Sequence, residues 1–296
     1  MARSIEKAGG VTSEGNVELK AHYARYRAVV QELTLMSDAF MRNVLKVTEC
    51  AEYVLRVILE KDDLRVTDVV VQQDNKNLQG RSAVLDCVAR DKDGRRFNVE
   101  VQQENEGASP ERARYHSGLL DANTLNPGED FTKLPESFVI FITRNDVLGA
   151  GLPIYHIERK IEETGCSFGD RSHIIYVTAS IQQEDTELGR LMHDFHCKCA
   201  DDMYSKILAD RVRALKETPK GVDNMCRELE KIYTEGRMEG RAEGRAEGRV
   251  EGIAEGIVSS IKSLMETLGL PIEAAMDALK IPKSEQHTYA ELLEKR

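Results

Sequence analysis

One stretch of the sequence, residues 82–103, constrains the fold more than any other, because it predicts a β-hairpin with acidic residues on both strands. Two arms rich in strand-forming residues flank Asp91-Lys92-Asp93-Gly94, whose glycine suits a tight turn. Asp86 falls on the first strand and Glu100 on the second. Side chains alternate between the two faces of a strand, so Glu100 and Gln102 share one face. The hairpin therefore predicts two carboxylates and an amide on one surface of a sheet.

Acidic side chains on a strand that is otherwise suited to burial are costly unless something pairs with them. A divalent cation is a suitable partner, because Mg²⁺ takes oxygen ligands from one or two carboxylates and keeps water for chemistry. The same spacing also fits an ordinary antiparallel hairpin whose acidic face is solvated, which from spacing alone is the commoner case. Both interpretations stay open at this point.

Length and composition limit the classes of protein that need to be considered. With 296 residues, the chain can bury a sizeable core in one large or two smaller domains. The sequence contains no apolar run of signal-peptide or transmembrane length, so we expect a cytoplasmic protein without membrane contact. A formal charge of −10 argues against a protein that coats nucleic acid. A local basic strip together with a metal ion would still suffice to hold one phosphate group.

The six cysteines are scattered and show neither the paired spacing of a zinc site nor the density of a disulfide scaffold. His193, His196, Cys197 and Cys199 do lie close together in the sequence. On a helix, His193 and Cys197 would share one face while His196 and Cys199 share another, so no single face collects all four. This spacing disfavours a structural metal there, because such sites need tetrahedral closure.

The order of the predicted elements indicates an α/β domain with a mixed sheet flanked by helices. Residues 1–30 form a polar, partly helical arm, and residues 31–180 form the core. Ser37 or Asp38 offers the N-cap of the first core helix. The remaining elements of the core are a helix at 51–59, a strand at 66–72, the hairpin, a helix at 110–125 and two short buried strands at 137–143 and 173–178.

Three helical segments are predicted beyond the core. Residues 181–234 have apolar residues at helical spacing and read as an extension that covers the core. Residues 235–256 are a repeat, and residues 257–296 predict short helices separated by Gly and Pro. The tail has no basic recognition face, which favours protein contact over DNA contact.

The repeat has the unit Glu-Gly followed in most copies by Arg, with glycines at 236, 240, 244, 248, 252 and 256. If helical, this period overruns the helical turn by about 40° per repeat, so each stripe winds in the right-handed sense. Stacked like charges, and a cost of about 1 kcal/mol per interior glycine, disfavour an isolated helix. A neighbouring helix would remove both problems. The segment is therefore either a solvated linker or a helix that forms a homo-oligomer.

The hairpin residues, taken in order, resemble the PD-(D/E)XK nuclease signature, with Asp86 as the lone Asp and Glu100-Val101-Gln102 in place of E-x-K. More specifically, the chain resembles the PD-(D/E)XK family transposases, also called recombination-promoting nucleases. The resemblance covers about residues 30–215 and implies a restriction-endonuclease-like core. Further similar segments are MSDAFMRNVL (36–45), NLQGRSAVLD (77–86), ERARYHSGLLDANTL (111–125), LPESFVIFIT (134–143), LPIYHIERKIEETG (152–165), HIIYV (173–177) and LMHDFHCKCADDMY (191–204).

The resemblance implies metal-dependent hydrolysis of DNA phosphodiesters, in the context of recombination or transposition. Asp86 and Glu100 would bind Mg²⁺ or Mn²⁺ with help from the Val101 carbonyl, and the metal would lower the pKa of a bound water. Gln102 departs from the family pattern, in which a Lys positions the water and supplies a positive charge. A glutamine can do the first by hydrogen bonding but not the second. Relatives in this group commonly carry Gln, so the change does not by itself imply inactivity.

Further candidates surround these residues. Arg112 and Arg114 are either phosphate contacts or part of an exposed helix face. Gln79 and Arg81 precede the Asp86 strand and are candidates for the same nucleic-acid-binding cleft. Asp38 is a candidate third acidic ligand, although the N-cap role is favoured.

Two other functions remain as alternatives. The first is a nuclease fold kept as a DNA-binding or assembly module, with Gln102 marking lost catalysis. The second is a metal-dependent hydrolase of small phosphoesters, which would need a closed small-molecule pocket that the sequence does not indicate.

Overall fold

A computed structural model describes residues 24–75 and 83–294 of the chain. Gln79 and Arg81 lie outside the described residues. The chain divides into two compact units, Met1–Leu229 and Glu230–Arg296. No helix among the described residues is long and apolar enough to cross a membrane.

The first unit is built on a six-stranded mixed sheet in the order β1-β2-β3-β4-β6-β5. Strands β1, β2 and β3 pair antiparallel, β3, β4 and β6 pair parallel, and β5 pairs antiparallel with β6 at the edge. This confirms the expected α/β class with a mixed sheet. The strands are β1 (Val66–Asn75), β2 (Ala83–Asp91), β3 (Arg96–Gln102), β4 (Ser137–Thr143), β5 (Ile154–Ile157) and β6 (Ser172–Thr178).

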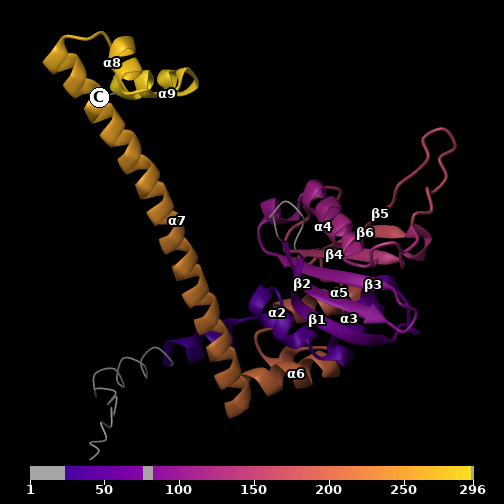
Figure 1. Cartoon of the computed structure of the whole chain (residues 1–296). Coiled ribbons are helices and arrows are strands. Elements are labelled where there is room, and N and C mark those ends of the chain that lie inside the picture. The colour runs from indigo at the N-terminus through magenta and orange to yellow at the C-terminus, as the bar shows by residue number, and fades with distance from the viewer. Residues whose placement is uncertain (1–23, 76–82, 295–296) are drawn as a thin grey trace, which may run out of the picture. The chain divides into compact units, whose positions relative to one another are not determined.

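Helices cover both faces of this sheet (Figure 1). Helix α4 (Pro110–Ala122) lies on one face, and the side chains of α2 (Asp38–Leu45), α3 (Thr48–Leu59), α5 (Glu187–His196) and α6 (Lys206–Lys216) join the main core on the other. Residues of β3 divide accordingly: Phe97, Val99 and Val101 belong to the main core. The alternate residues Asn98 and Glu100 contact α4 instead. Alternation along β3 thus delivers its polar side chains to the α4 side.

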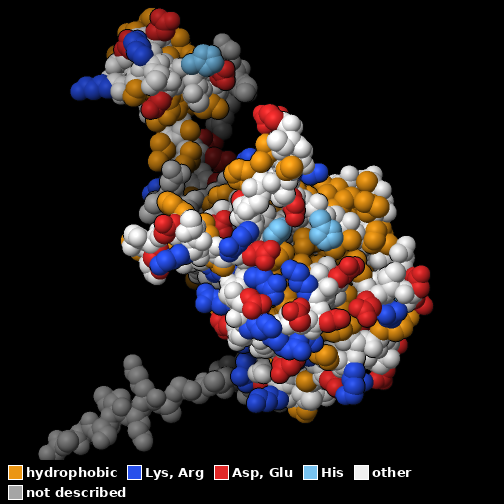
Figure 2. Space-filling view, turned by 90° about the vertical axis from the view of Figure 1, so that its right-hand side faces the viewer, with side chains coloured by type: hydrophobic (Ala, Val, Ile, Leu, Met, Phe, Trp, Pro, Cys, Tyr) orange, Lys and Arg blue, Asp and Glu red, His pale blue; other side chains and the backbone are white. Residues whose placement is uncertain are grey.

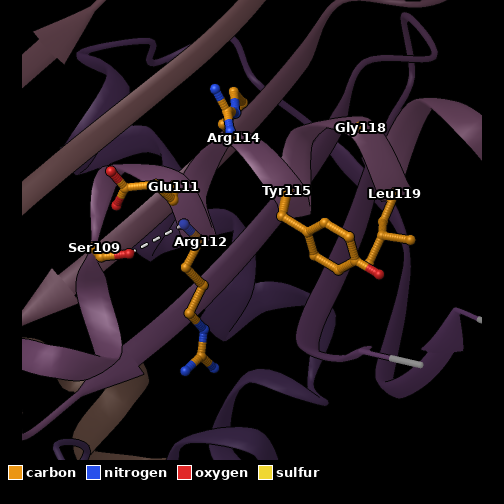
Figure 3. A pocket seen from close by; sticks show the side chains of 7 residues that line it. All are labelled: Ser109, Glu111, Arg112, Arg114, Tyr115, Gly118 and Leu119. Atoms are coloured by element: carbon orange, nitrogen blue, oxygen red, sulfur yellow. Dashed lines mark hydrogen bonds between the residues drawn. The ribbon is translucent and has the colours of Figure 1, made fainter. Parts of the chain in front are cut away.

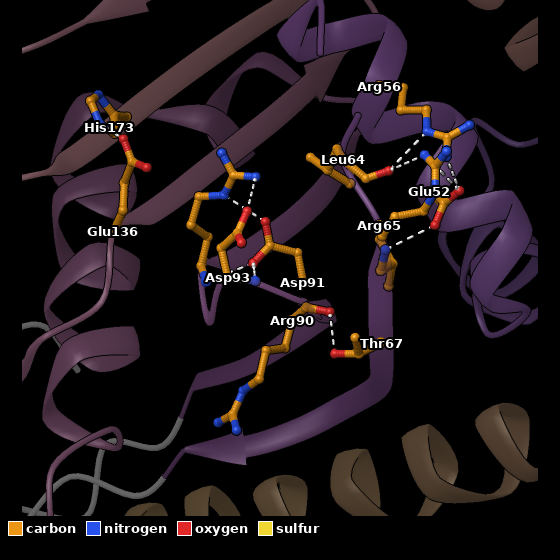
Figure 4. A network of polar contacts seen from close by, with 12 residues as sticks. Glu52, Arg56, Leu64, Arg65, Thr67, Arg90, Asp91, Asp93, Glu136 and His173 are labelled. Carbon is orange, nitrogen blue, oxygen red and sulfur yellow. Dashed lines mark hydrogen bonds and ion pairs between the residues drawn. The ribbon is translucent and has the colours of Figure 1, made fainter. Parts of the chain in front are cut away.

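The turn between β2 and β3 is fixed by Asp91, a buried residue. Its Oδ1 accepts from the backbone N–H groups of Asp93 (3.0 Å) and Arg95 (2.8 Å), and its Oδ2 pairs with the Arg95 guanidinium (Figure 4). Gly94 has φ of 82°, a conformation that suits glycine. These contacts hold the register of the hairpin that carries Asp86 and Glu100.

The second unit contains most of α7 (Pro219–Leu268) together with α8 (Ile272–Ala278) and α9 (Lys283–Glu294). Ile261 of α7 packs with Ala275 and Met276 of α8 in a small core of its own. The Glu-Gly-Arg repeat lies within α7 and is helical. The sequence left open whether this segment is a linker or a helix, and in the structure it is a helix.

Candidate functional site

Asp86 of β2 and Glu100 of β3 are close neighbours in the sheet. Each lies one residue beyond the last pair of the β2–β3 ladder, in which Cys87 pairs with Val99 and Val88 with Asn98. The backbone N–H of Asp86 donates to Glu100 Oε1 at 3.3 Å. The two carboxyl groups also lie within hydrogen-bonding reach of each other. The hairpin thus brings the two predicted acidic residues together on one face.

The two oxygens of the fully buried Glu100 carboxylate have different surroundings. Oε1 accepts from Asn98 Nδ2 at 2.9 Å and lies 3.3 Å from His116 Nδ1, in addition to the contact with Asp86 N–H. Oε2 is buried and has no hydrogen-bond partner among the described residues. The Arg112 guanidinium lies 3.8 Å from Oε2 and is partly exposed. A buried carboxylate oxygen without a hydrogen-bond partner costs free energy unless a ligand binds to it.

Helix α4 supplies the groups above Glu100. It begins after Ser109, whose hydroxyl accepts from the backbone N–H of Arg112 at 3.2 Å, and Pro110 suits the first turn. Arg112 and His116 are four residues apart and therefore share one face of the helix. His116 and Asn98 were not predicted as site residues. The alternation that pairs Asn98 with Glu100, and the helical spacing between Arg112 and His116, were the available signals.

Asp38 approaches the pair from the first turn of α2. The N-cap position is held by Ser37, without a side-chain capping bond, and Asp38 is the first helical residue. The favoured N-cap role for Asp38 is therefore wrong. Its Oδ2 pairs with Arg42 at 3.1 Å, and its Oδ1 is buried without a hydrogen-bond partner among the described residues. The Gln103 side chain ties the end of β3 to this segment by donating to the Met36 carbonyl at 2.9 Å.

The pKa shifts of these carboxyl groups follow from their burial and mutual repulsion. Burial, the charge of Glu100 and the charge of Asp38 raise the pKa of Asp86 to about 9. Burial and the Glu100 charge raise the pKa of Asp38, with Arg42 opposing. Burial raises the pKa of Glu100. Hydrogen bonds from His116, Asn98 and the Asp86 backbone have a larger effect, and they hold the pKa of Glu100 below its usual range. Three carboxyl groups therefore share one electrostatic environment, in which Arg42 pairs with Asp38 and Arg112 lies 3.8 Å from Glu100.

The residues present fit a hard divalent cation. Asp86 is half-buried, and Glu100 Oε2 and Asp38 Oδ1 are buried oxygens without hydrogen-bond partners in the described part of the chain. Carboxylate oxygens are the ligands that Mg²⁺ and Mn²⁺ prefer. A bound cation would offset the repulsion between the carboxylates and would give the two unpaired oxygens a partner. Val101 is paired with Ile142 in the β3–β4 ladder, and its carbonyl stays a predicted ligand.

Gln102 is half-buried at the end of β3. Its side chain lies against the backbone of Gly107, where an added Cβ would fall 2.1 Å from Gln102 Oε1. Only a residue without a side chain fits at position 107 while Gln102 keeps this position. Alternation along β3 places Gln102 on the same face as Glu100, and Gly107 of the 3-10 turn at Asn105–Ala108 leaves room there for the amide.

Arg112 and Arg114 point in different directions from α4 (Figure 3). Arg112 reaches toward Glu100, whereas Arg114, two residues later, projects from another side of the helix. Both line a surface hollow of about 650 Å³ along α4, together with Ser109, Glu111, Tyr115, Gly118 and Leu119. Only Arg112 is therefore brought to the carboxylates, and the hollow lies on the outer side of the helix.

The core has no uniformly basic face in the view of Figure 2, where Lys and Arg side chains alternate with Asp and Glu. This mixture agrees with the net charge of −10. On this face, contact with an anionic polymer would therefore depend on single cations rather than on a broad positive surface.

A second group of possible metal ligands lies at the C-terminal end of α5, where ligand atoms of His193, Asp194 and the C-cap residue Cys197 fall within 4.8 Å of one another. Both oxygens of Asp194 already accept backbone N–H bonds, from Tyr204 at 2.7 Å and Ser205 at 2.8 Å. Burial and the charge of Asp194 raise the pKa of Cys197 to about 11, which disfavours the thiolate that binds metals. The geometry favours a structural role for this cluster.

A known protein family matches the part of the chain that forms the sheet. Residues 53–187 match the PD-(D/E)XK nuclease family transposases. The match confirms the resemblance seen in the sequence, and it includes Asp86, Glu100, Gln102, Arg112 and Arg114 but not Asp38. It supports a nuclease-type hydrolase with DNA as substrate, in a family whose members generally use divalent metal ions. Neither a curated protein nor a solved structure matches the chain.

Proposed function

We propose that the chain is a DNA endonuclease that depends on Mg²⁺ or Mn²⁺ and acts in recombination or transposition. The observation that carries this proposal is the convergence of Asp38, Asp86 and Glu100, in which two carboxylate oxygens have no hydrogen-bond partner among the described residues. Asp86 and Glu100 lie inside the family match at residues 53–187. A bound cation would lower the pKa of a coordinated water and offset the negative charge that develops on the phosphate.

Each neighbouring residue has a task in this proposal. Asp86 and Glu100 hold the cation, Asp38 adds a third carboxylate, and the Val101 carbonyl is available as a further ligand. The Gln102 amide orients the attacking water by hydrogen bonding. Arg112 offers its exposed guanidinium to a phosphate next to the one that is cleaved. Gln79, Arg81 and Arg114 are proposed as more distant backbone contacts.

The direct test is cleavage of supercoiled plasmid by the purified full-length protein. Nicked or linear DNA in Mg²⁺ or Mn²⁺, and none in EDTA, is the expected result. Binding of DNA without cleavage under every cation tried would favour the alternative function, a nuclease fold used as a DNA-binding or assembly module.

We also propose that α7 pairs in parallel with α7 of a second copy. An added Cβ at each of the six repeat glycines would meet no described residue within 4 Å, so no contact with the described part of the chain accounts for them. Each Gly follows a Glu and in most copies precedes an Arg, so the glycine stripe has a Glu stripe about 100° to one side and an Arg stripe about 100° to the other. In a parallel pair the Glu stripe of one helix meets the Arg stripe of its partner. In an antiparallel pair like charges would meet.

A further inference from the structure

The Glu100 carboxylate accepts hydrogen bonds at one oxygen, whereas the other accepts none from the described residues and lies 3.8 Å from the Arg112 guanidinium. Three donors converge on Oε1: Asn98 Nδ2 at 2.9 Å, His116 Nδ1 at 3.3 Å and the backbone N–H of Asp86 at 3.3 Å. Oε2 is equally buried and accepts no hydrogen bond from the described residues. Burial alone does not explain this asymmetry, because both oxygens belong to a side chain with no exposed surface.

The 3.3 Å contact with Glu100 Oε1 is the basis on which a proton is assigned to His116 Nδ1. Glu100 Oε1 is an acceptor only, so the N–H must lie on Nδ1 for the 3.3 Å contact to be favourable. Asn98 Nδ2 lies 3.5 Å from Nδ1, and one of its two hydrogens is donated to Glu100 Oε1 over the shorter distance of 2.9 Å. His116 and Asn98 are therefore parallel donors to one oxygen, the former from the helix and the latter from the strand.

The ring of His116 has no freedom to leave this position. The residue is 2 % exposed, and its ring lies against Phe141 of β4 with centroids 5.8 Å apart. Ser109 fixes the start of α4 two turns earlier. Because the ring is packed in place, its N–H is a fixed reference that determines how the Glu100 carboxylate is rotated.

We infer that His116 is a positioning residue, which anchors Glu100 Oε1 so that Oε2 is left as a ready ligand for a divalent cation. This inference rests on the proposed function, and it adds a residue to the site. A carboxylate that is already held in its binding orientation loses less conformational freedom when the ion binds. Loss of a residue that hydrogen-bonds to a metal ligand typically weakens metal affinity by about 10- to 100-fold.

A purely structural role for His116 predicts something different. If the ring only fills space between α4 and the sheet, phenylalanine would serve equally well, since it keeps the contact with Phe141. Asparagine keeps a donor at the place of Nδ1 but loses most of the ring. The two substitutions His116→Phe and His116→Asn therefore separate packing from hydrogen bonding.

The test is calorimetric titration of Mn²⁺ into the full-length wild type and both variants, with thermal unfolding in EDTA as the control for folding. We expect His116→Phe to weaken Mn²⁺ binding by at least about tenfold while remaining folded, and His116→Asn to stay within about threefold of wild type even if it melts earlier. Wild-type affinity in His116→Phe, or equal loss in both variants with both folded, would overturn the inference. Failure of the proposed cation site itself would show separately, as no Mn²⁺ uptake by the wild type.

Discussion

The backbone N–H of Asp86 donates to the carboxylate of Glu100, while the carboxyl group of Asp86 is repelled by the same carboxylate. The pair is thus fixed in place by one contact and destabilised by another. Enzymes commonly hold charged groups in this way where a ligand completes the site. The destabilisation can be measured before any cation is added.

We predict that Asp86→Asn stabilises the metal-free protein above neutral pH. The pKa of Asp86 is about 9 in the folded state and near its ordinary value of about 3.9 when unfolded. Between these values the folded state keeps a proton that the unfolded state has released, so the free energy of unfolding falls as pH rises. The variant lacks this loss, and we expect it to be more stable by about 1–3 kcal/mol at pH 8.

Thermal melts in EDTA from pH 5 to 9 measure this effect. Asp63→Asn is the matched control, because Asp63 is an exposed carboxylate on the same unit. The prediction fails if wild type and Asp86→Asn lose stability equally over this range.

Gln102→Lys should keep cleavage activity and can raise it, because a lysine there adds a further positive charge on the face of β3 that carries Glu100. We expect Arg112→Ala to reduce cleavage by about tenfold, equivalent to ~1.4 kcal/mol, since it removes the guanidinium 3.8 Å from Glu100. The two substitutions combined should recover part of that loss. Initial rates of plasmid nicking compare the four proteins, and complete inactivity of Gln102→Lys would mean that the amide makes a contact that an ammonium group cannot replace.

Gly107→Ala should impair cleavage with little change in stability. The new Cβ would fall 2.1 Å from Gln102 Oε1, and the flexible end of that side chain can swing away at small cost. The amide would then leave the face that it shares with Glu100. Cleavage rate and melting temperature, measured on the same preparation, test this. Full activity would show that the present position of the Gln102 amide is unimportant.

Deleting residues 235–256 should leave the first unit folded and abolish self-association. The segment has no large apolar side chain before Val250 except Met238, which is 65 % exposed. Parallel pairing through Glu and Arg stripes should also weaken at high salt. Light scattering on both proteins at low and high salt decides the matter, and the same monomeric mass for both at every concentration would leave α7 as a spacer helix.

The sequence predicted the hairpin and the central strands well, because alternation and a glycine turn are local signals. Strand β5 was missed, since Ile154–Ile157 is a short edge strand that exists through pairing with β6. The helical repeat stayed undecided between helix and linker, because glycine cost and charge pattern point in opposite directions. Boundaries among the predicted domains remain predictions.

The candidate site was predicted only in part. Asp86 and Glu100 could be paired from strand register, but the approach of Asp38 depends on how α2 packs against the sheet. His116 looked like one more residue of an ordinary helix, and its contact with Glu100 depends on the distance between α4 and β3. Contacts between distant segments of this kind are set by tertiary packing, which no single-sequence pattern encodes.

The central claim is that Asp86 and Glu100 together hold the cation that DNA cleavage requires. The most direct measurement is cleavage of supercoiled plasmid in Mg²⁺ and Mn²⁺ by wild type, Asp86→Asn and Glu100→Gln, purified in parallel and matched for folding by thermal melts. The account predicts cleavage by the wild type and a loss of at least about 100-fold in each variant, ~2.7 kcal/mol or more in the barrier. Cleavage by either folded variant at the wild-type rate would contradict it.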